Sequence, residues 1–108
     1  MNKIANKRIT SNLINDLNDE LIFQHKKWGI QDHENFKWLA IVTEELGEAA
    51  QEILEIDFLL RKDIINIKSV EHRRELLRAE LIQVAASAIS FIECLDRKVD
   101  KRSDLDYN

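Results

Sequence analysis

The sequence has no proline and only two glycines, Gly29 and Gly47, among its 108 residues. Tight turns depend on these residue types, so the composition argues against a sheet of hairpins and predicts long helices with short connections. The single cysteine, Cys94, excludes an internal disulfide and is typical of a reducing compartment. No apolar run reaches the length of a membrane span, and residues 1–8 lack a signal-peptide core. We therefore expect a cytoplasmic protein with no membrane partner.

The charge balance narrows the classes of partner. Apolar residues make up 44% of the chain and charged residues 33%, which is ordinary for a soluble globular domain. The formal net charge is −4, so a nucleic-acid backbone is not an expected partner. The length corresponds to one domain with a modest core.

Apolar residues recur at helical spacing over most of the chain, which predicts an all-α fold of three long helices. We expect helices over residues 11–28, 36–57 and 70–98, with Ser11, Asn35 and Ser69 as candidate N-caps. The first helix starts at Ser11 or nearer Ile4, and Gly29 is its natural stop. Residues 58–68 either extend the second helix or form a short separate one. Residues 1–98 then form a single helical domain, followed by a charged tail, 99–108, that we expect to fray.

Glutamates interrupt the apolar pattern of the second helix. Its stripe is centred on Val42, Leu46, Ala49 and Ile53. Counting about 100° per residue, Glu45 projects roughly 60° from that centre and Glu48 roughly 120°, on the same side. Glu45 therefore borders the core, one turn from a second carboxylate. A carboxylate there needs a partner or a cation, because an unpaired buried charge is costly. Gly47 inside this helix suggests close packing or a nearby ligand.

The third helix repeats this arrangement. Its stripe contains Leu77, Leu81, Val84, Ala88, Phe91 and Leu95. Glu80 lies about 40° from the stripe centre, and Gln83 follows one turn later. If the two faces pack together, Glu45, Glu48, Glu80 and Gln83 converge. Oxygen ligands alone favour a hard cation, Mg²⁺ or Mn²⁺, over zinc. The alternative is a buried ion pair of Glu80 with Arg73 or Arg74, whereas Glu44, Glu52 and Glu55 are expected to be solvated or paired.

These residues resemble a known family. Glu45-x-x-Glu48 followed by Glu80-x-x-Gln83 is similar to the pattern of the MazG-like all-α nucleoside triphosphate pyrophosphohydrolases, which is Glu-x-x-Glu, a spacer and Glu-x-x-Asp. The resemblance, to the small phage and bacterial type, covers about residues 26–95. It includes Lys27-Trp28-Gly29, the stretch from Trp38 to Gln51, and Glu80 to Ala86. The chain departs from the family pattern at Gln83, where the family has aspartate, and in a longer spacer.

The resemblance implies a Mg²⁺-dependent enzyme that cleaves a nucleoside triphosphate to the monophosphate and pyrophosphate. It implies that Glu45, Glu48 and Glu80, with Gln83, hold the cation, and that Glu44 orients the attacking water. It also implies a homodimer or homotetramer, in which a second copy completes a helical bundle. The rival hypothesis is a non-catalytic MazG-like oligomer that binds a nucleotide or a protein, which Gln83 favours. A purely structural bundle would need Glu45 and Glu80 to pair with basic residues.

Four further residues are candidates for contact with substrate. Trp28 and Trp38 have the aromatic rings to stack on a base, although a core or interface position is the commoner role of tryptophan. Lys27 and Arg73 have the charge to neutralise phosphates, although such residues are more often surface charges. Asp32 and His33 fall in a loop that we expect at the edge of a pocket, and Cys94 has the character of a small buried residue.

Overall fold

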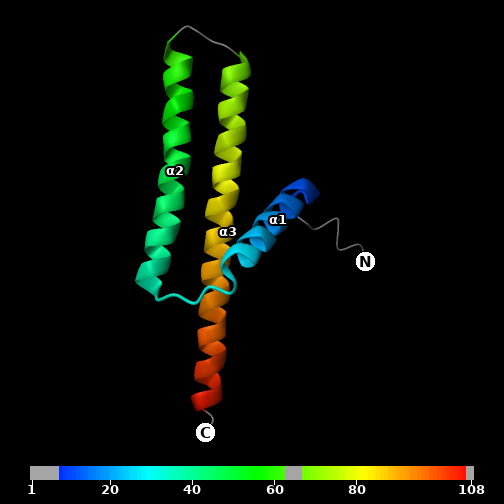
Figure 1. Cartoon of the computed structure of the whole chain (residues 1–108), viewed down its shortest axis with the longest axis vertical. Coiled ribbons are helices and arrows are strands. Elements are labelled where there is room, and N and C mark those ends of the chain that lie inside the picture. Colours follow the sequence, from blue (N-terminus) through cyan, green and yellow to red (C-terminus); the bar gives the residue numbers. More distant parts are fainter. Residues whose placement is uncertain (1–7, 63–66, 107–108) are drawn as a thin grey trace.

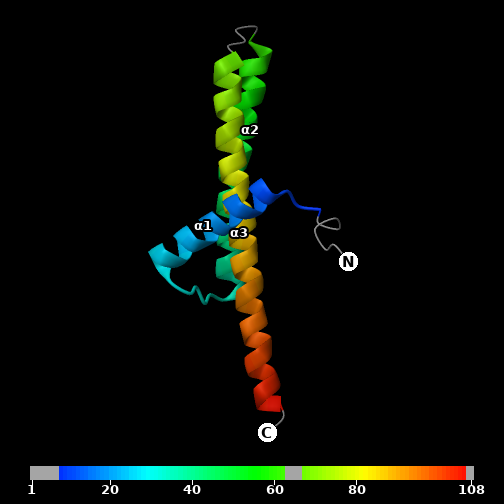
Figure 2. The same cartoon turned by 90° about the vertical axis from the view of Figure 1, so that its right-hand side faces the viewer.

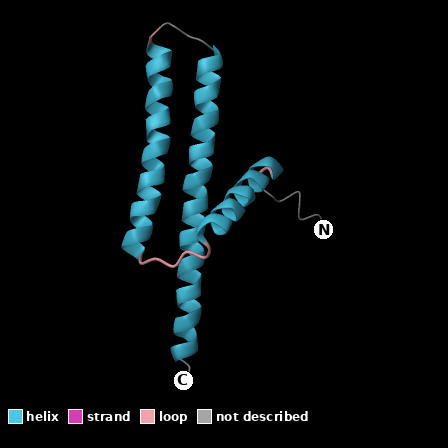
Figure 3. Ribbon diagram, viewed as in Figure 1, coloured by secondary structure: helices cyan, strands magenta, loops and turns pink. Residues whose placement is uncertain are grey.

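The computed structural model, which describes residues 8–62 and 67–106, consists of three helices (Figure 1). They are α1 (Ser11–Trp28), α2 (Asn35–Arg61) and α3 (Ile67–Asp106). The described residues contain helices and loops but no strand (Figure 3). The predicted all-α class is therefore confirmed. No helix in these two ranges is both long enough and apolar enough to cross a membrane.

α1 is bounded by a residue with a suitable conformation at each end. The Thr10 hydroxyl accepts a hydrogen bond from the Leu13 amide at 3.3 Å, so Thr10 is the N-cap and Ser11 is the first helical residue. At the other end Gly29 has φ of 72°, and its amide donates to the His25 carbonyl at 2.8 Å. Glycine takes this left-handed conformation without steric cost, which confirms the predicted stop.

The other predicted helix ends are less accurate. The prediction that Asn35 caps the second helix is wrong, because α2 begins at Asn35 and its N-cap is Glu34, with no side-chain hydrogen bond. Ser69 lies inside α3 rather than before it. Residues 58–61 continue α2, which agrees with the alternative that residues 58–68 extend the second helix. Residues 63–66 lie outside the described ranges. α3 does not end near Lys98 but continues to Asp106, well into the expected tail.

α2 and α3 run side by side as an antiparallel pair, and α1 crosses α3 obliquely (Figures 1 and 2). α1 packs against α3 and makes no comparable contact with α2. The most buried apolar side chains are few and mostly small: Trp38, Ala49, Val70, Ile82, Ala86 and Cys94. Ala86 and Ser87 of α3 are also buried, so small side chains lie where α3 packs against its neighbours.

The buried faces differ from the predicted stripes. Ala49 is buried, but Leu46 and Ile53, placed at the centre of the second helix's stripe, are 53% and 52% exposed. On α3, Leu81 and Leu95 are likewise exposed. Relative to the predicted stripe, the face of α2 that packs against α3 is shifted around the helix, toward the side of Trp38, Glu45 and Ala49. Each helix therefore has more apolar surface than the single chain buries.

Gly47 does not mark close packing. A Cβ atom added there meets nothing within 4 Å, and its φ lies outside the range that strains other residues. The expectation of close packing is therefore wrong within one chain, and glycine costs α2 helical stability at this position.

We predict that Gly47→Ala raises the free energy of unfolding by about 0.5–1 kcal/mol, because alanine restricts the unfolded chain and favours the helix. Urea denaturation followed by circular dichroism measures the change. Ala50→Gly, at an exposed position of the same helix, is the matched control and should lower stability by a similar amount. A loss of stability in Gly47→Ala would mean that another molecule approaches this backbone.

Candidate functional site

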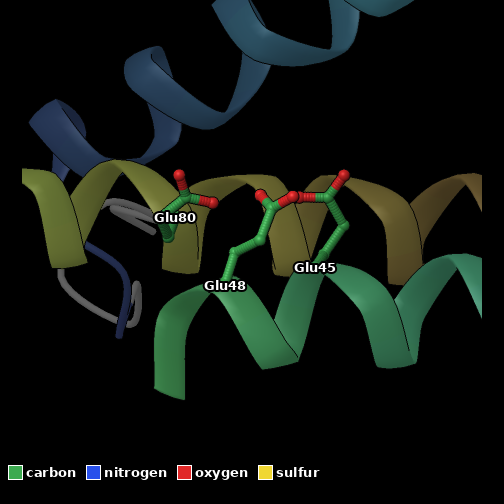
Figure 4. A group of neighbouring side chains, drawn as sticks. All are labelled: Glu45, Glu48 and Glu80. Atoms are coloured by element: carbon green, nitrogen blue, oxygen red, sulfur yellow. The ribbon is translucent and has the colours of Figure 1, made fainter. Parts of the chain in front are cut away.

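Three carboxylates meet between α2 and α3. Glu45 and Glu48 extend from successive turns of α2, and Glu80 reaches toward them from α3 (Figure 4). One ligand oxygen from each residue lies within 4.8 Å of the others. We call this group the glutamate trio. The angular positions of these glutamates beside the apolar stripes predicted that they converge, because the faces that carry them pack against each other.

Two members of the trio each have one buried oxygen without a hydrogen-bond partner. Glu45 and Glu80 are half-buried, and the Oε2 atom of each is inaccessible to solvent and has no hydrogen-bond partner. Glu48 is exposed. The ion pairs seen among the described side chains join Arg61 to Asp57, Arg73 to Glu52 and Arg78 to Asp16. None of these pairs involves the trio, so the buried ion pair considered for Glu80 is not formed with Arg73.

The electrostatics of the trio favour neutral carboxyls. Burial raises the pKa of Glu80 from 4.5 to about 7, assisted by a hydrogen bond with Glu48 and by the charges of Glu48, Glu45 and Glu52. Burial is also the main cause that raises the pKa of Glu45, followed by the charges of Glu48, Glu44 and Glu20. Both shifts mean that the folded state favours the uncharged form of these carboxyls, because burial and like charges disfavour the carboxylate.

Two acidic residues beside the trio were not identified as site residues from the sequence. Glu20 of α1 accepts a hydrogen bond from Gln24 Nε2 at 3.0 Å and is close enough to affect Glu45. Glu52 pairs with Arg73 Nη1 at 3.2 Å and affects Glu80. Glu52 was expected to be solvated or paired, and the pairing is confirmed; its position one turn after Glu48 is the signal that could have placed it beside the trio. Nothing local in the sequence indicates which carboxylate of α1 approaches Glu45.

Gln83 and Glu44 occupy different positions relative to the trio. Gln83 is half-buried on α3, one turn after Glu80. Glu44 is exposed and lines a cavity together with Glu45. Glu45 therefore belongs both to the trio and to the wall of this cavity, which places the carboxylates at its edge.

The cavity lies among α1, α2 and the loop between them, and has a volume of about 630 Å³. Its lining is mixed in character and comprises Gln24, Trp28, Ile30, Gln31, Asp32, His33, Lys37, Trp38, Ile41, Glu44, Glu45 and Ser87. The expectation that Asp32 and His33 edge a pocket is confirmed. Gln24, Lys37 and Ser87 are lining residues that the sequence did not indicate, because they come from three different helices.

The two tryptophans differ in accessibility. Trp38 is 1% exposed; its ring stacks on Phe91 at 5.6 Å between centroids and meets the edge of the His33 ring at 5.0 Å. Its Nε1 has no hydrogen-bond partner. Trp28 is 56% exposed and lines the cavity, and the Lys27 ammonium lies 4.6 Å from its ring centroid. Trp28 is thus placed to contact a ligand, whereas Trp38 is a core residue that reaches the cavity wall. Lys27 and Arg73 are not among the lining residues.

Comparison with protein-family models, with curated proteins and with solved structures finds no match to this chain.

We predict that the metal-free protein loses stability as the pH rises. Between about 4.5 and about 7, Glu80 keeps its proton in the folded state and has lost it in the unfolded state. The free energy of unfolding therefore falls across this window and levels off above it, by up to about 3 kcal/mol. Urea denaturation at several pH values, in the presence of a chelator, measures the slope.

Glu80→Gln should flatten most of this slope, because glutamine does not titrate. Glu75→Gln, an exposed glutamate on the same helix, is the control and should keep the slope of the parent protein. An unchanged slope in Glu80→Gln would contradict the raised pKa of Glu80.

Proposed function

We propose that the glutamate trio binds Mg²⁺ or Mn²⁺ and that the protein is a nucleotide pyrophosphohydrolase, cleaving a nucleoside triphosphate to the monophosphate and pyrophosphate. The observation that carries this proposal is the pair of buried carboxylate oxygens, one each on Glu45 and Glu80, that have no partner. Carboxylates in such a position are stabilised by a cation, since burial without one costs several kcal/mol.

The donor set fits a hard cation. All three ligands are carboxylates, whose oxygens lie within 4.8 Å of one another. Oxygens on opposite sides of one Mg²⁺ ion are about 4 Å apart, because each Mg–O bond is about 2 Å long. The flexible, exposed side chain of Glu48 supplies the small adjustment that remains. Gln83, one turn after Glu80, adds an amide oxygen as a fourth candidate ligand.

The adjoining cavity suits a nucleotide in size and in chemistry. Its volume of about 630 Å³ lies within the usual range for small-molecule sites, about 300–1,000 Å³. Trp28 offers an accessible aromatic face to a base, and Lys37 offers a positive charge. Since Glu45 is shared by the cavity and the trio, a nucleotide bound in the cavity has its phosphates directed toward the cation.

The proposed reaction is the attack of water on the α-phosphorus. The bond from the α-phosphorus to the oxygen that bridges the α- and β-phosphates breaks, and pyrophosphate leaves. A bound divalent cation would neutralise phosphate charge and act as a Lewis acid. Glu44 lines the cavity and is exposed, so we propose that it orients the water and accepts its proton. Trp28 and Gln24 would hold the nucleotide against this face.

The alternative is a non-catalytic helical oligomer that binds a nucleotide or a protein partner. The neutral Gln83 favours it, because three formal charges hold a cation less tightly than four. The two functions differ in turnover of a nucleotide, so a measurement of pyrophosphate release separates them.

We predict that millimolar Mg²⁺ raises the melting temperature by several degrees and that the protein releases pyrophosphate from at least one nucleoside triphosphate. The melting temperature rises because the cation binds the folded state. Differential scanning fluorimetry measures the shift, and a screen of standard and damaged nucleotides for pyrophosphate, with and without Mg²⁺, measures turnover.

Glu80→Gln should reduce the metal-dependent shift by at least half and lower turnover at least a hundredfold. Glu75→Gln should leave both unchanged. A Mg²⁺ shift without pyrophosphate release from any nucleotide would favour the non-catalytic alternative. The absence of a Mg²⁺ shift would contradict the metal site itself.

We further propose that the partner is a second copy of this chain, giving a homodimer or homotetramer. Four apolar residues of α2 repeat at intervals of seven and are about half exposed: Leu39, Leu46, Ile53 and Leu60. We call them the outer stripe. A seven-residue repeat on one helix face is the pattern by which helices pair along their length. The radius of gyration, 18.3 Å, also exceeds the value of about 13 Å for a compact chain of this length.

We predict that the protein sediments as a dimer or tetramer at micromolar concentration, and that Leu46→Glu shifts it to the monomer because it places a charge in the middle of the outer stripe. Gln51→Glu adds the same charge at an exposed position on another face of α2 and should leave the assembly intact. A monomeric parent protein would contradict this proposal.

A further inference from the structure

We infer that α1 and the loop of residues 29–34 form a lid over the cavity, held closed by three side chains of α3: Cys94, Arg97 and Lys98. We call the loop the strap. The inference concerns access to the cavity, so it holds whether or not the proposed hydrolysis takes place.

The strap is fixed by donors from a single face of α3. Arg97 Nη2 donates to the Gln31 carbonyl at 2.8 Å, and Lys98 Nζ donates to the His33 carbonyl at 2.8 Å. The Cys94 thiol donates to Asp32 Oδ1 at 3.3 Å and lies 3.6 Å from the same His33 carbonyl. Residues three and four apart share one face of a helix, so positions 94, 97 and 98 act together. The Gln31 and His33 carbonyls lie in a loop, so these side chains of α3 provide the hydrogen bonds that a helix would otherwise supply.

The rest of the lid is lightly held. Gln24 is the only residue of α1 that is buried. Apolar side chains such as Ile22, Phe23 and Trp28 are 44% to 57% exposed. α1 packs against α3 but makes no comparable contact with α2. Segments with few buried apolar contacts open at low free-energy cost, so the closed position of α1 depends on the strap.

The lid forms one side of the cavity. Gln24 and Trp28 of α1 and Gln31, Asp32 and His33 of the strap line it, opposite residues of α2 that include Lys37 and Glu44. Gly29, with φ of 72°, joins the two parts of the lid and sets the direction in which the strap leaves α1. Release of the strap from α3 would therefore widen the cavity on the side that Gln31, Asp32 and His33 line.

Trp38 reports on the state of the lid. It is 1% exposed, and the His33 ring of the strap covers it at 5.0 Å between centroids. The other face of Trp38 stacks on Phe91 of α3, which does not move with the strap. When the strap leaves α3, His33 leaves with it, and Trp38 becomes accessible to small molecules in solution.

Acrylamide quenching of Trp38 fluorescence tests the lid in the full-length protein. The chain has two tryptophans, so Trp28→Phe makes Trp38 the sole reporter. In that background, Arg97→Ala/Lys98→Ala should raise the Stern–Volmer quenching constant at least threefold, because two of the bonds that hold the strap are lost. The helical circular dichroism signal should stay within error of the parent.

The chain offers a matched control at the end of α2. Arg61 and Lys62 are also adjacent; Arg61 pairs with Asp57 at 2.9 Å, and Lys62 lies over the Phe58 ring. Arg61→Ala/Lys62→Ala removes the same two charges far along the sequence from the strap and should leave the quenching constant unchanged. If the Arg97/Lys98 double variant does not fold, Lys98→Ala alone serves, because Lys98 is exposed; it should raise the constant about 1.5-fold or more.

Hydrogen exchange measured by mass spectrometry distinguishes a lid from general loosening. In the double variant, exchange should accelerate over residues 11–34 and stay unchanged over residues 36–60 and 70–90. An unchanged quenching constant in the folded variant would overturn the inference. So would an acceleration of exchange spread evenly over all three helices.

Discussion

The repulsion among carboxylates that α2 and α3 bring together is the constraint on which this structure depends. The two helices are joined over much of their length by small side chains such as Ala49, Ala86 and Ser87, yet Glu45 and Glu80 lie within the same interface. Packing that excludes solvent from the Oε2 atom of each residue also raises the pKa of both. The contact that holds the helix pair together thus also desolvates the carboxyl groups of Glu45 and Glu80, which supports the proposed cation site.

The convergence of the acidic residues was predictable because it depends on local geometry. The angular position of a residue on a helix follows from its number, and an acidic residue within an apolar face must point toward whatever covers that face. Glu45, Glu48 and Glu80 satisfy this rule. Helix starts were less predictable. A cap contributes only about 1 kcal/mol, so a candidate cap residue does not by itself fix a helix start, and Ser69 lies within α3.

Which part of each apolar face the chain buries within itself was not predictable. Periodicity identifies the stripe, but Leu46 and Ile53 are as apolar as the residues that α3 covers, and both are exposed. One neighbouring helix cannot cover an apolar stripe this broad. The local sequence does not indicate which residues of the stripe stay exposed. Gln24 and Glu20 were not predicted as site residues for a related reason. The crossing of α1 over α3 is set by packing between distant segments rather than by the sequence of α1.

The cavity draws its walls from parts of the chain that differ in how firmly they are held. Ile41, Glu44 and Glu45 belong to the long antiparallel pair, whereas Gln24 and Trp28 belong to a helix that, among the described residues, packs against α3 alone. Substitutions in α1 therefore reshape the wall that faces a ligand without displacing the acidic residues. The α1 side of the cavity can therefore diverge in sequence while the interface of α2 and α3, which positions the three carboxylates, is retained.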